Sequence, residues 1–424
     1  MSGPRATRPS GWAVAAQSAA GVTFIVAASL AAPVLALEND RLTVSAGEEL
    51  THDDNVFRVS PAATPSGGGE DTYRTTSVAL DADVPVGDQR LQGNFAISQM
   101  RFDRLDALDT NAHDGAVRWL WKAGAELDGT VGYRDRLALA SLANVQGGVQ
   151  SAIPNVLETS ETWFEAAYRA TARWRLRGGW HATDYSNSAE VYRISDANIG
   201  ALEAELDYIT RAGNGLGLVI RSVDGRLPNP QFVSVPDPDP QLVSVTQVDN
   251  SYRDRGIALL AQWAPTGKSR LEARAGHLER SYAQYPQRGY VGPTFDAKYE
   301  WRPVGRVVLE VIGHHGPSLY EEVQVGYVLS RGVSARLSFA LRDKVSFAVA
   351  SEQAHRSYLG DAGPVLGDFP PPSEHLTLRS LTVSYNPIPK VQLTVALQQQ
   401  NRSSTLEFSS YRVDTGTVGV RVRF

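Results

Sequence analysis

Hydrophobic and polar residues alternate with a period of two along most of this chain. In Val391–Gln399, valine and leucine occupy every second position, and glutamine, threonine and alanine stand between them. In Tyr411–Phe424 the same alternation places Val418, Val420 and Val422 on one face, and arginines, glycine and threonines on the other. Because successive side chains of a strand point to opposite faces, each segment predicts a β-strand with one apolar and one polar face.

About eighteen such segments follow one another, joined alternately by short and long connections. An even number of strands, with short turns at one end and long loops at the other, is typical of a transmembrane antiparallel β-barrel with periplasmic turns and extracellular loops. We therefore predict an all-β barrel. The predicted strands are Asp40–Leu50, Tyr73–Val84, Gln89–Phe102, Ala112–Trp121, Glu126–Leu137, Glu158–Arg169, Trp174–Asp184, Arg193–Ile209, Leu216–Gly225, Ser251–Ala264, Arg270–Tyr282, Tyr290–Arg302, Arg306–His314, Val333–Arg342, Val345–Tyr358, His375–Tyr385, Val391–Asn401 and Ser410–Phe424. The predicted long loops are Thr51–Thr72, Leu139–Leu157, Leu227–Asn250, Gly316–Gly332 and Leu359–Glu374.

Composition agrees with this architecture and argues against others. Although 42% of the residues are hydrophobic, no uninterrupted apolar run of the mature chain is long enough for a transmembrane helix. Cysteine is absent, so neither disulfides nor thiol chemistry contributes. The formal net charge of −5 gives no support for nucleic-acid binding.

The first residues have the pattern of a secretory signal peptide. Arginines precede an apolar core, Val22–Leu35, and a small-residue cleavage site follows it. Pro33 interrupts the core, which makes an uncleaved anchor helix the weaker alternative. We predict a cleavable signal peptide at residues 1–36 and an exported barrel, integral to the bacterial outer membrane, at residues 37–424.

Charged residues occupy alternate positions in many predicted strands. They cannot all face an apolar core, which would leave them without water, but they can face a hydrated lumen. Both signs are interspersed, which argues against a dedicated phosphate channel and is compatible with uncharged or mildly acidic sugar polymers. The alternative is that these charges only pair across the wall and stiffen the barrel. The predicted lumen-lining residues are Asp128, Arg134, Glu165, Arg169, Arg175, Arg177, Glu203, Glu205, Asp207, Arg274, Asp296, Lys298, Glu300, Arg302, Arg421 and Arg423.

One arginine breaks this two-sided pattern. Arg379 has the same parity as Leu381 and Val383, which belong to the apolar face of their strand. A β-bulge would move Arg379 to the other face, and a position at the wide outer rim of the barrel would allow it to stay on the apolar face. The sequence leaves both explanations open.

Other candidate sites lack the partners that their chemistry requires. Gly267–Ser269 is no phosphate-binding loop, because Gln262 stands where that motif needs glycine. His314 and His315 are adjacent and point to opposite faces, which is poor geometry for a shared metal. Asp53–Asn55 lacks further calcium ligands, so a solvated loop is the preferred interpretation. No pattern ties together the residues that a hydrolase barrel would need, namely Ser281, Ser357, His277 and His355. We predict no catalytic residue, no metal site and no cofactor.

The stretch after the first predicted strand resembles a known family. Its residues Asp53, Asp54, Asn55, Val56, Phe57 and Arg58 are similar to the D-x-N-[VI]-[FY]-R signature of EpsL-type outer-membrane proteins, which belong to the β-barrel porin-2 group. Leu278–Tyr282, His355–Tyr358 and the aromatic-x-Pro turns are also similar to that group. In the bacterial barrels that this chain resembles, a terminal Phe such as Phe424 is the recognition signal for the assembly machinery.

This resemblance implies a role in exopolysaccharide export, as a conduit or accessory pore. The implied partners are polysaccharide, outer-membrane lipids, the barrel-assembly machinery and a periplasmic export component, with no nucleic acid among them. A general diffusion porin for small hydrophilic solutes is the alternative, and an enzymatic barrel is the least favoured. Strand number does not separate the first two functions.

Overall fold

The computed structural model describes residues 41–61, 69–140, 153–236, 243–318, 327–359, 373–405 and 409–424. The predicted signal peptide at residues 1–36 lies outside these ranges. Among the described residues, no helix combines the length and apolarity needed to cross a membrane.

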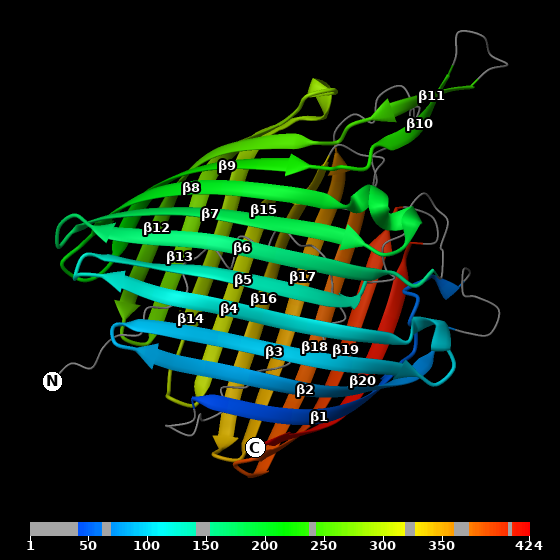
Figure 1. Ribbon diagram of the computed structural model, residues 1–424, viewed down its shortest axis with the longest axis horizontal. Helices are drawn as coiled ribbons and strands as arrows, with labels where there is room; N and C mark the ends of the chain where they lie inside the picture. Colours follow the sequence, from blue (N-terminus) through cyan, green and yellow to red (C-terminus); the bar gives the residue numbers. More distant parts are fainter. Residues whose placement is uncertain are drawn as a thin grey trace.

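Eighteen strands form one closed antiparallel sheet, seen from the side in Figure 1. Each barrel strand pairs with its neighbours along the chain, and β1 (Leu42–Asp53) also pairs with β20 (Tyr411–Arg423), which closes the barrel. The predicted fold class is thereby confirmed. The remaining barrel strands are β2 (Asp71–Val86), β3 (Gln89–Phe102), β4 (Thr110–Ala123), β5 (Leu127–Leu139), β6 (Val156–Arg169), β7 (Trp174–Asn187), β8 (Ala197–Ile209), β9 (Gly215–Arg226), β12 (Tyr252–Thr266), β13 (Ser269–Tyr282), β14 (Tyr290–Trp301), β15 (Val307–Ser318), β16 (Tyr327–Arg342), β17 (Val345–Leu359), β18 (Ser373–Ile388) and β19 (Val391–Ser404).

Tight turns join the strands at one end of the barrel. Gly87, Gly124 and Gly213 lie in three of these turns with positive φ, a conformation that costs glycine little because it has no Cβ. The other end carries the longer connections, which include the 3₁₀ helices η2 (Asp106–Leu108) and η4 (Pro286–Arg288). By the usual asymmetry of such barrels, the tight turns are periplasmic and the longer connections extracellular.

Three predicted boundaries are wrong. Strand β16 begins at Tyr327, inside the predicted loop Gly316–Gly332 and ahead of the predicted start at Val333. The predicted loop Leu227–Asn250 contains a hairpin of β10 (Gln231–Pro236) and β11 (Val243–Val248), which projects beyond the barrel wall at the upper right of Figure 1. Valines alternate in both short strands, but the prolines between them hid the pattern. The predicted strand Arg193–Ile209 begins only at Ala197, because Glu190–Ser195 forms the 3₁₀ helix η3.

Large apolar side chains are exposed at every second position of the barrel strands. In β19 these are Leu393, Val395 and Leu397, and their neighbours in β18 and β20 continue the surface. We call this the outer face and the opposite one the inner face. An apolar surface of this extent is costly in water, whereas the acyl chains of a bilayer cover it.

Aromatic side chains are exposed where strands end in tight turns. Trp263, Trp301 and Tyr385 occupy such positions in β12, β14 and β18. Rings with a polar atom prefer the boundary between acyl chains and water, so they form the girdle that is typical of membrane barrels. The fold therefore places this chain in the outer membrane as an integral protein.

Candidate functional site

The inner face of β8 carries three acidic residues in succession. Glu203, Glu205 and Asp207 are buried, while Leu202 and Leu206 on the outer face are exposed. Strand alternation alone produces this division. A buried carboxylate is costly unless it is paired and hydrogen-bonded, so each acid requires partners on the inner face.

Arg274 of β13 supplies one of these partners across two intervening strands. Its Nη1 and Nη2 donate to Glu203 Oε2 and Oε1, both at 3.0 Å. Strands β9 and β12 separate β8 from β13 in the sheet. In a closed barrel, side chains from strands that are not neighbours meet only on the concave side. These charges therefore lie inside the barrel.

Arg177 of β7 serves the other two acids. Its Nε donates to Asp207 Oδ2 at 2.9 Å, and its Nη2 binds Glu205. Gly217 of β9 leaves room for this cluster, because a Cβ there would stand 2.5 Å from Asp207 Oδ1. The charges are thus packed closely and paired directly.

Further ion pairs continue this arrangement around the inner face. Asp128 lies 3.3 Å from Arg169 and 3.7 Å from Arg175, and Glu165 lies 3.3 Å from His181. We call the residues of these pairs the inner charged band, which consists of Asp128, Glu165, Arg169, Arg175, Arg177, His181, Glu203, Glu205, Asp207 and Arg274.

The other predicted lumen residues lie outside this band. Arg134 pairs with Asp114 at 2.7 Å, Lys298 with Glu310 at 2.6 Å, and Arg302 with Glu300 at 2.9 Å. Arg421 and Arg423 lie at the tight-turn end of β20, next to Gly47 and Ser45 of β1. Asp296 lies on β14 opposite His314, and it borders a cavity.

That cavity has a volume of about 150 Å³ and lies against β9 and β12–β16. Its polar lining includes Arg221, Arg274, Asp296 and His314. The Nε of Arg221 is buried and has no hydrogen-bond partner among the described residues. His314 Nε2 lies 3.1 Å from Ser330 Oγ, and its neighbour His315 pairs with Arg331 instead, so the two histidines are not brought together.

Sequence reasoning missed several charged residues of the inner face. Asp254 of β12 accepts two hydrogen bonds from Arg280 of β13, at 2.7 and 2.8 Å, and the Arg280 guanidinium lies 4.1 Å from the centre of the Tyr252 ring. Strand parity could have placed Asp254 on the inner face, because alternation along β12 puts it on the same face as Gly256 and Ala258. Others include Asp114, His181, Arg221 and Glu310.

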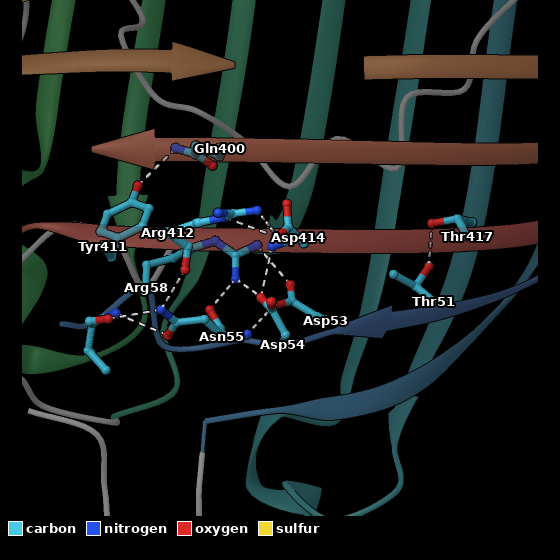
Figure 2. A network of polar contacts seen from close by, with 11 residues as sticks. Thr51, Asp53, Asp54, Asn55, Arg58, Gln400, Tyr411, Arg412, Asp414 and Thr417 are labelled. Carbon is cyan, nitrogen blue, oxygen red and sulfur yellow. Dashed lines mark hydrogen bonds and ion pairs between the residues drawn. The ribbon is translucent and has the colours of Figure 1, made fainter. Parts of the chain in front are cut away.

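The six motif residues lie at the extracellular mouth, where β1 ends beside β20. Figure 2 shows four of them, Asp53, Asp54, Asn55 and Arg58. Arg58 donates from Nη1 to Asp53 Oδ1 at 2.9 Å and from Nη2 to Asp53 Oδ2 at 2.8 Å. Both side chains are buried, with 4% and 1% of their surface exposed. Arg58 has a φ of +55°, which turns the chain back toward Asp53. The predicted solvated loop at Asp53–Asn55 is therefore wrong for Asp53, which is buried, whereas Asp54 is exposed.

Asn55 and Asp54 fasten this turn to the last strand. Asn55 Nδ2 donates to the carbonyls of Val59 at 2.8 Å and Arg412 at 3.1 Å. Asp54 Oδ1 accepts from the backbone N–H of Asp414 at 2.8 Å. Figure 2 shows these contacts joining the turn after β1 to β20. The motif thus has a structural role at the seam between the first and last strands.

The apolar residues of the motif cover the inner face at this end. Val56 and Phe57 of the motif, together with Val59 just after it, are buried against Tyr73 of β2 and Phe102 of β3, whose rings lie 4.8 Å apart. Tyr73 and Phe102 have the parity of the inner face, since Val78 and Ile97 are exposed on the outer face. The turn after β1 therefore folds into the mouth and narrows it.

Phe424 follows β20 directly. The residue is 69% exposed, and its backbone N–H donates to Val44 O at 2.9 Å. This contact attaches the residue to β1. Recognition of Phe424 by an assembly machinery stays a prediction.

A closed barrel with an apolar outer face, an aromatic girdle and a charged inner face defines a porin-like outer-membrane protein. Residues 264–424, from the end of β12 to β20, match the model of the family described as "Putative beta-barrel porin 2". This match does not extend to the EpsL-type assignment.

Solved structures with a similar course include two proteins of Pseudomonas aeruginosa. OccK2 (OpdF) is 12% identical, with 90% of this chain and 97% of that chain covered at a TM-score of 0.46. OpdK is 12% identical, with 90% and 99% covered at a TM-score of 0.47. The receptor FauA of Bordetella pertussis is 10% identical, with 91% and 76% covered at 0.42. Likeness at this level says nothing about what this chain transports. No curated protein matches the sequence.

Proposed function

We propose that this protein is a diffusion porin for small hydrophilic solutes. The observation that carries this proposal is the inner charged band on the concave side of a closed barrel. Paired charges still have donors and acceptors that their partners do not use, and these are best satisfied by water, so a face of this composition favours a hydrated interior over a dry, filled one. In this proposal, the predicted lumen residues line the pathway along which solutes cross the barrel.

The pairing of the charges indicates the class of solute. In Arg274–Glu203 and in Arg177 with Glu205 and Asp207, cations and anions neutralise one another locally. A wall of this kind offers many hydrogen-bond donors and acceptors without a large field of one sign. It suits neutral or zwitterionic solutes better than a single class of ion. The narrowed mouth favours small solutes over a polymer.

Exopolysaccharide export is the second candidate, and it rests on the resemblance of the Asp53–Arg58 motif. The motif residues bind one another and β20, so their contacts account for the motif without a polymer. Partners such as polysaccharide or a periplasmic export component belong to this second candidate only. The barrel-assembly machinery is an expected partner in either case.

Two measurements test the proposed function. Liposomes that contain the purified barrel should swell in an isosmotic solution of a monosaccharide and should not swell in one of a large dextran. A null strain should take up small hydrophilic solutes more slowly and secrete polysaccharide normally. Liposomes that do not swell, together with lost polysaccharide secretion in the null strain, would replace diffusion by export.

Reversing one inner charge should change ion selectivity. Lys298 pairs with Glu310 and shares its strand face with Glu300, so Lys298→Glu brings three carboxylates together. The reversal potential in planar bilayers should then shift toward cation selectivity, because a group of acids lowers the energy of a passing cation. Lys268→Glu makes the same charge change in a tight turn and is the matched control. An equal shift in both variants would argue against a pathway along Lys298.

A further inference from the structure

Basic side chains form a row on the outer face of β15–β18. His315 pairs with Arg331, Arg331 with His355, and His355 with His375, so the four are successive cross-strand neighbours. Arg379 lies four residues after His375 on the same face of β18. All five share the parity of the exposed Val333, Val349 and Leu381. We call these five residues the outer basic patch.

The ladder around Arg379 settles its orientation. Strand β18 pairs with β17 without interruption from Ser373 to Tyr385, and its pairing with β19 shifts only between Tyr385 and Ile388. A β-bulge at Arg379 is therefore excluded, and the bulge explanation of its parity is wrong. Arg379 lies on the outer face, in the position that follows Leu381 toward the extracellular end.

The patch lies at the extracellular edge of the apolar surface. Read from the tight-turn end, the outer face of β18 presents Tyr385, Val383 and Leu381, and then Arg379, Thr377 and His375. The outer face of β17 changes in the same way after Val349. A molecule that covers both the apolar surface and the outer basic patch must have apolar chains toward the tight-turn end and an anionic group toward the extracellular end.

Several cations of the outer face have an acidic partner on a neighbouring strand or loop. Arg74 lies 3.3 Å from Glu48, Arg101 lies 3.6 Å from Asp109, and Arg253 lies 2.6 Å from Asp224. Within the described part of the chain, no carboxylate lies within 4.0 Å of Arg331 or Arg379. Side chains directly opposite on neighbouring strands have Cβ atoms about 5 Å apart, so the Arg331 guanidinium stands next to two imidazoles, His315 and His355, and not next to a carboxylate. Such a row calls for an anion from outside the chain.

We propose that the outer basic patch binds the phosphate groups of a phosphorylated glycolipid in the outer leaflet. The Arg331 and Arg379 guanidinium groups each offer a planar fork that matches two phosphate oxygens. His355 lies opposite Arg331, and His375 lies opposite His355 on the strand that carries Arg379. Gln353 and Thr377 offer hydrogen bonds to sugar hydroxyls. The acyl chains of the same lipid lie against the apolar surface below. This site is independent of what passes through the barrel.

Binding of lipid A by the purified barrel tests this proposal. The barrel is titrated in detergent with diphosphorylated lipid A and with its dephosphorylated form, and native mass spectrometry counts bound lipid. Wild-type protein should prefer the phosphorylated form by about tenfold or more, as expected for two arginines close to a lipid headgroup. The double variant R331Q/R379Q should lose this preference. The double variant R101Q/R253Q removes two cations that already have acidic partners, and it should keep the preference.

Several outcomes would overturn the proposal. One is equal binding of the two lipids by wild-type protein, a comparison that does not depend on the folding of any variant. Another is an unchanged preference in R331Q/R379Q that migrates as a folded barrel on gels. A third is displacement of lipid A by millimolar inorganic phosphate, which would indicate a plain anion site that needs no acyl chain.

Discussion

A Val395→Arg variant should form far less folded barrel than a Thr394→Arg variant. Val395 of β19 is 47% exposed on the outer face and stands between Val383 of β18 and Val418 of β20. A cation on the lipid face near the middle of the membrane costs about 2–4 kcal/mol. At about 1.4 kcal/mol per factor of ten, the ratio of folded to unfolded barrel should fall roughly 30- to 700-fold.

Thr394 is the matched control, because it precedes Val395 in the same strand and takes the same substitution. It stands between Ser384 and Gly419 on the inner face, where an added guanidinium can be hydrated. Heat-modifiable migration on gels, after refolding into lipid vesicles from increasing urea, measures the folded fraction of each variant. Equal folding of the two would mean that the outer and inner faces are assigned wrongly.

An Asp53→Ala variant should release the turn at the extracellular mouth. It leaves the buried Arg58 without its carboxylate partner, and breaking a buried pair in this way costs about 3–5 kcal/mol. The positive φ of Arg58 adds to the strain, since a residue with a Cβ adopts it at a cost of about 1–2 kcal/mol. The turn should open locally while the barrel persists, and trypsin should then cut after Arg58. The rate of this cleavage in the purified barrel is the measurement.

Glu48→Ala provides the comparison for this cleavage. It breaks the Glu48–Arg74 pair, whose side chains are 54% and 63% exposed, and exposed pairs contribute about 0–1 kcal/mol. The rate of cleavage after Arg58 should stay at the wild-type value in this variant. If Asp53→Ala resists trypsin as well as wild-type protein does, the Asp53–Arg58 pair does not hold the turn.

The barrel could be predicted from the sequence because its strands obey a local rule. Lipid on one side and polar groups on the other impose alternation residue by residue, as in Val391–Gln399. Where a loop contained its own strands, as in the β10–β11 hairpin, prolines interrupted the pattern and the prediction failed. Arg379 followed the rule as well, although it looked like an exception, because the outer face becomes polar toward the extracellular end.

The contacts of the candidate site could not be predicted in the same way. Parity assigns Glu203 to the charged face of β8, but it cannot select Arg274 as its partner, because that choice depends on the curvature of the closed sheet. Asp53 looked solvated for a similar reason. Its burial requires the turn at Arg58 and the proximity of β20, and neither leaves a local signal.

The closure between β1 and β20 has a consequence for how the chain folds. The hydroxyls of Thr51 and Thr417 lie 2.9 Å apart although 366 positions separate them along the chain. Contacts between residues this far apart in sequence cost the most loop-closure entropy. They are therefore expected to form after the contacts of the local hairpins. Before the barrel closes, β1 and β20 each have one edge without a partner strand, and such edges can pair with other chains. The contacts of Asn55 with Arg412 and of Asp54 with Asp414 form only when these edges meet, so the motif at the mouth completes the last step of folding.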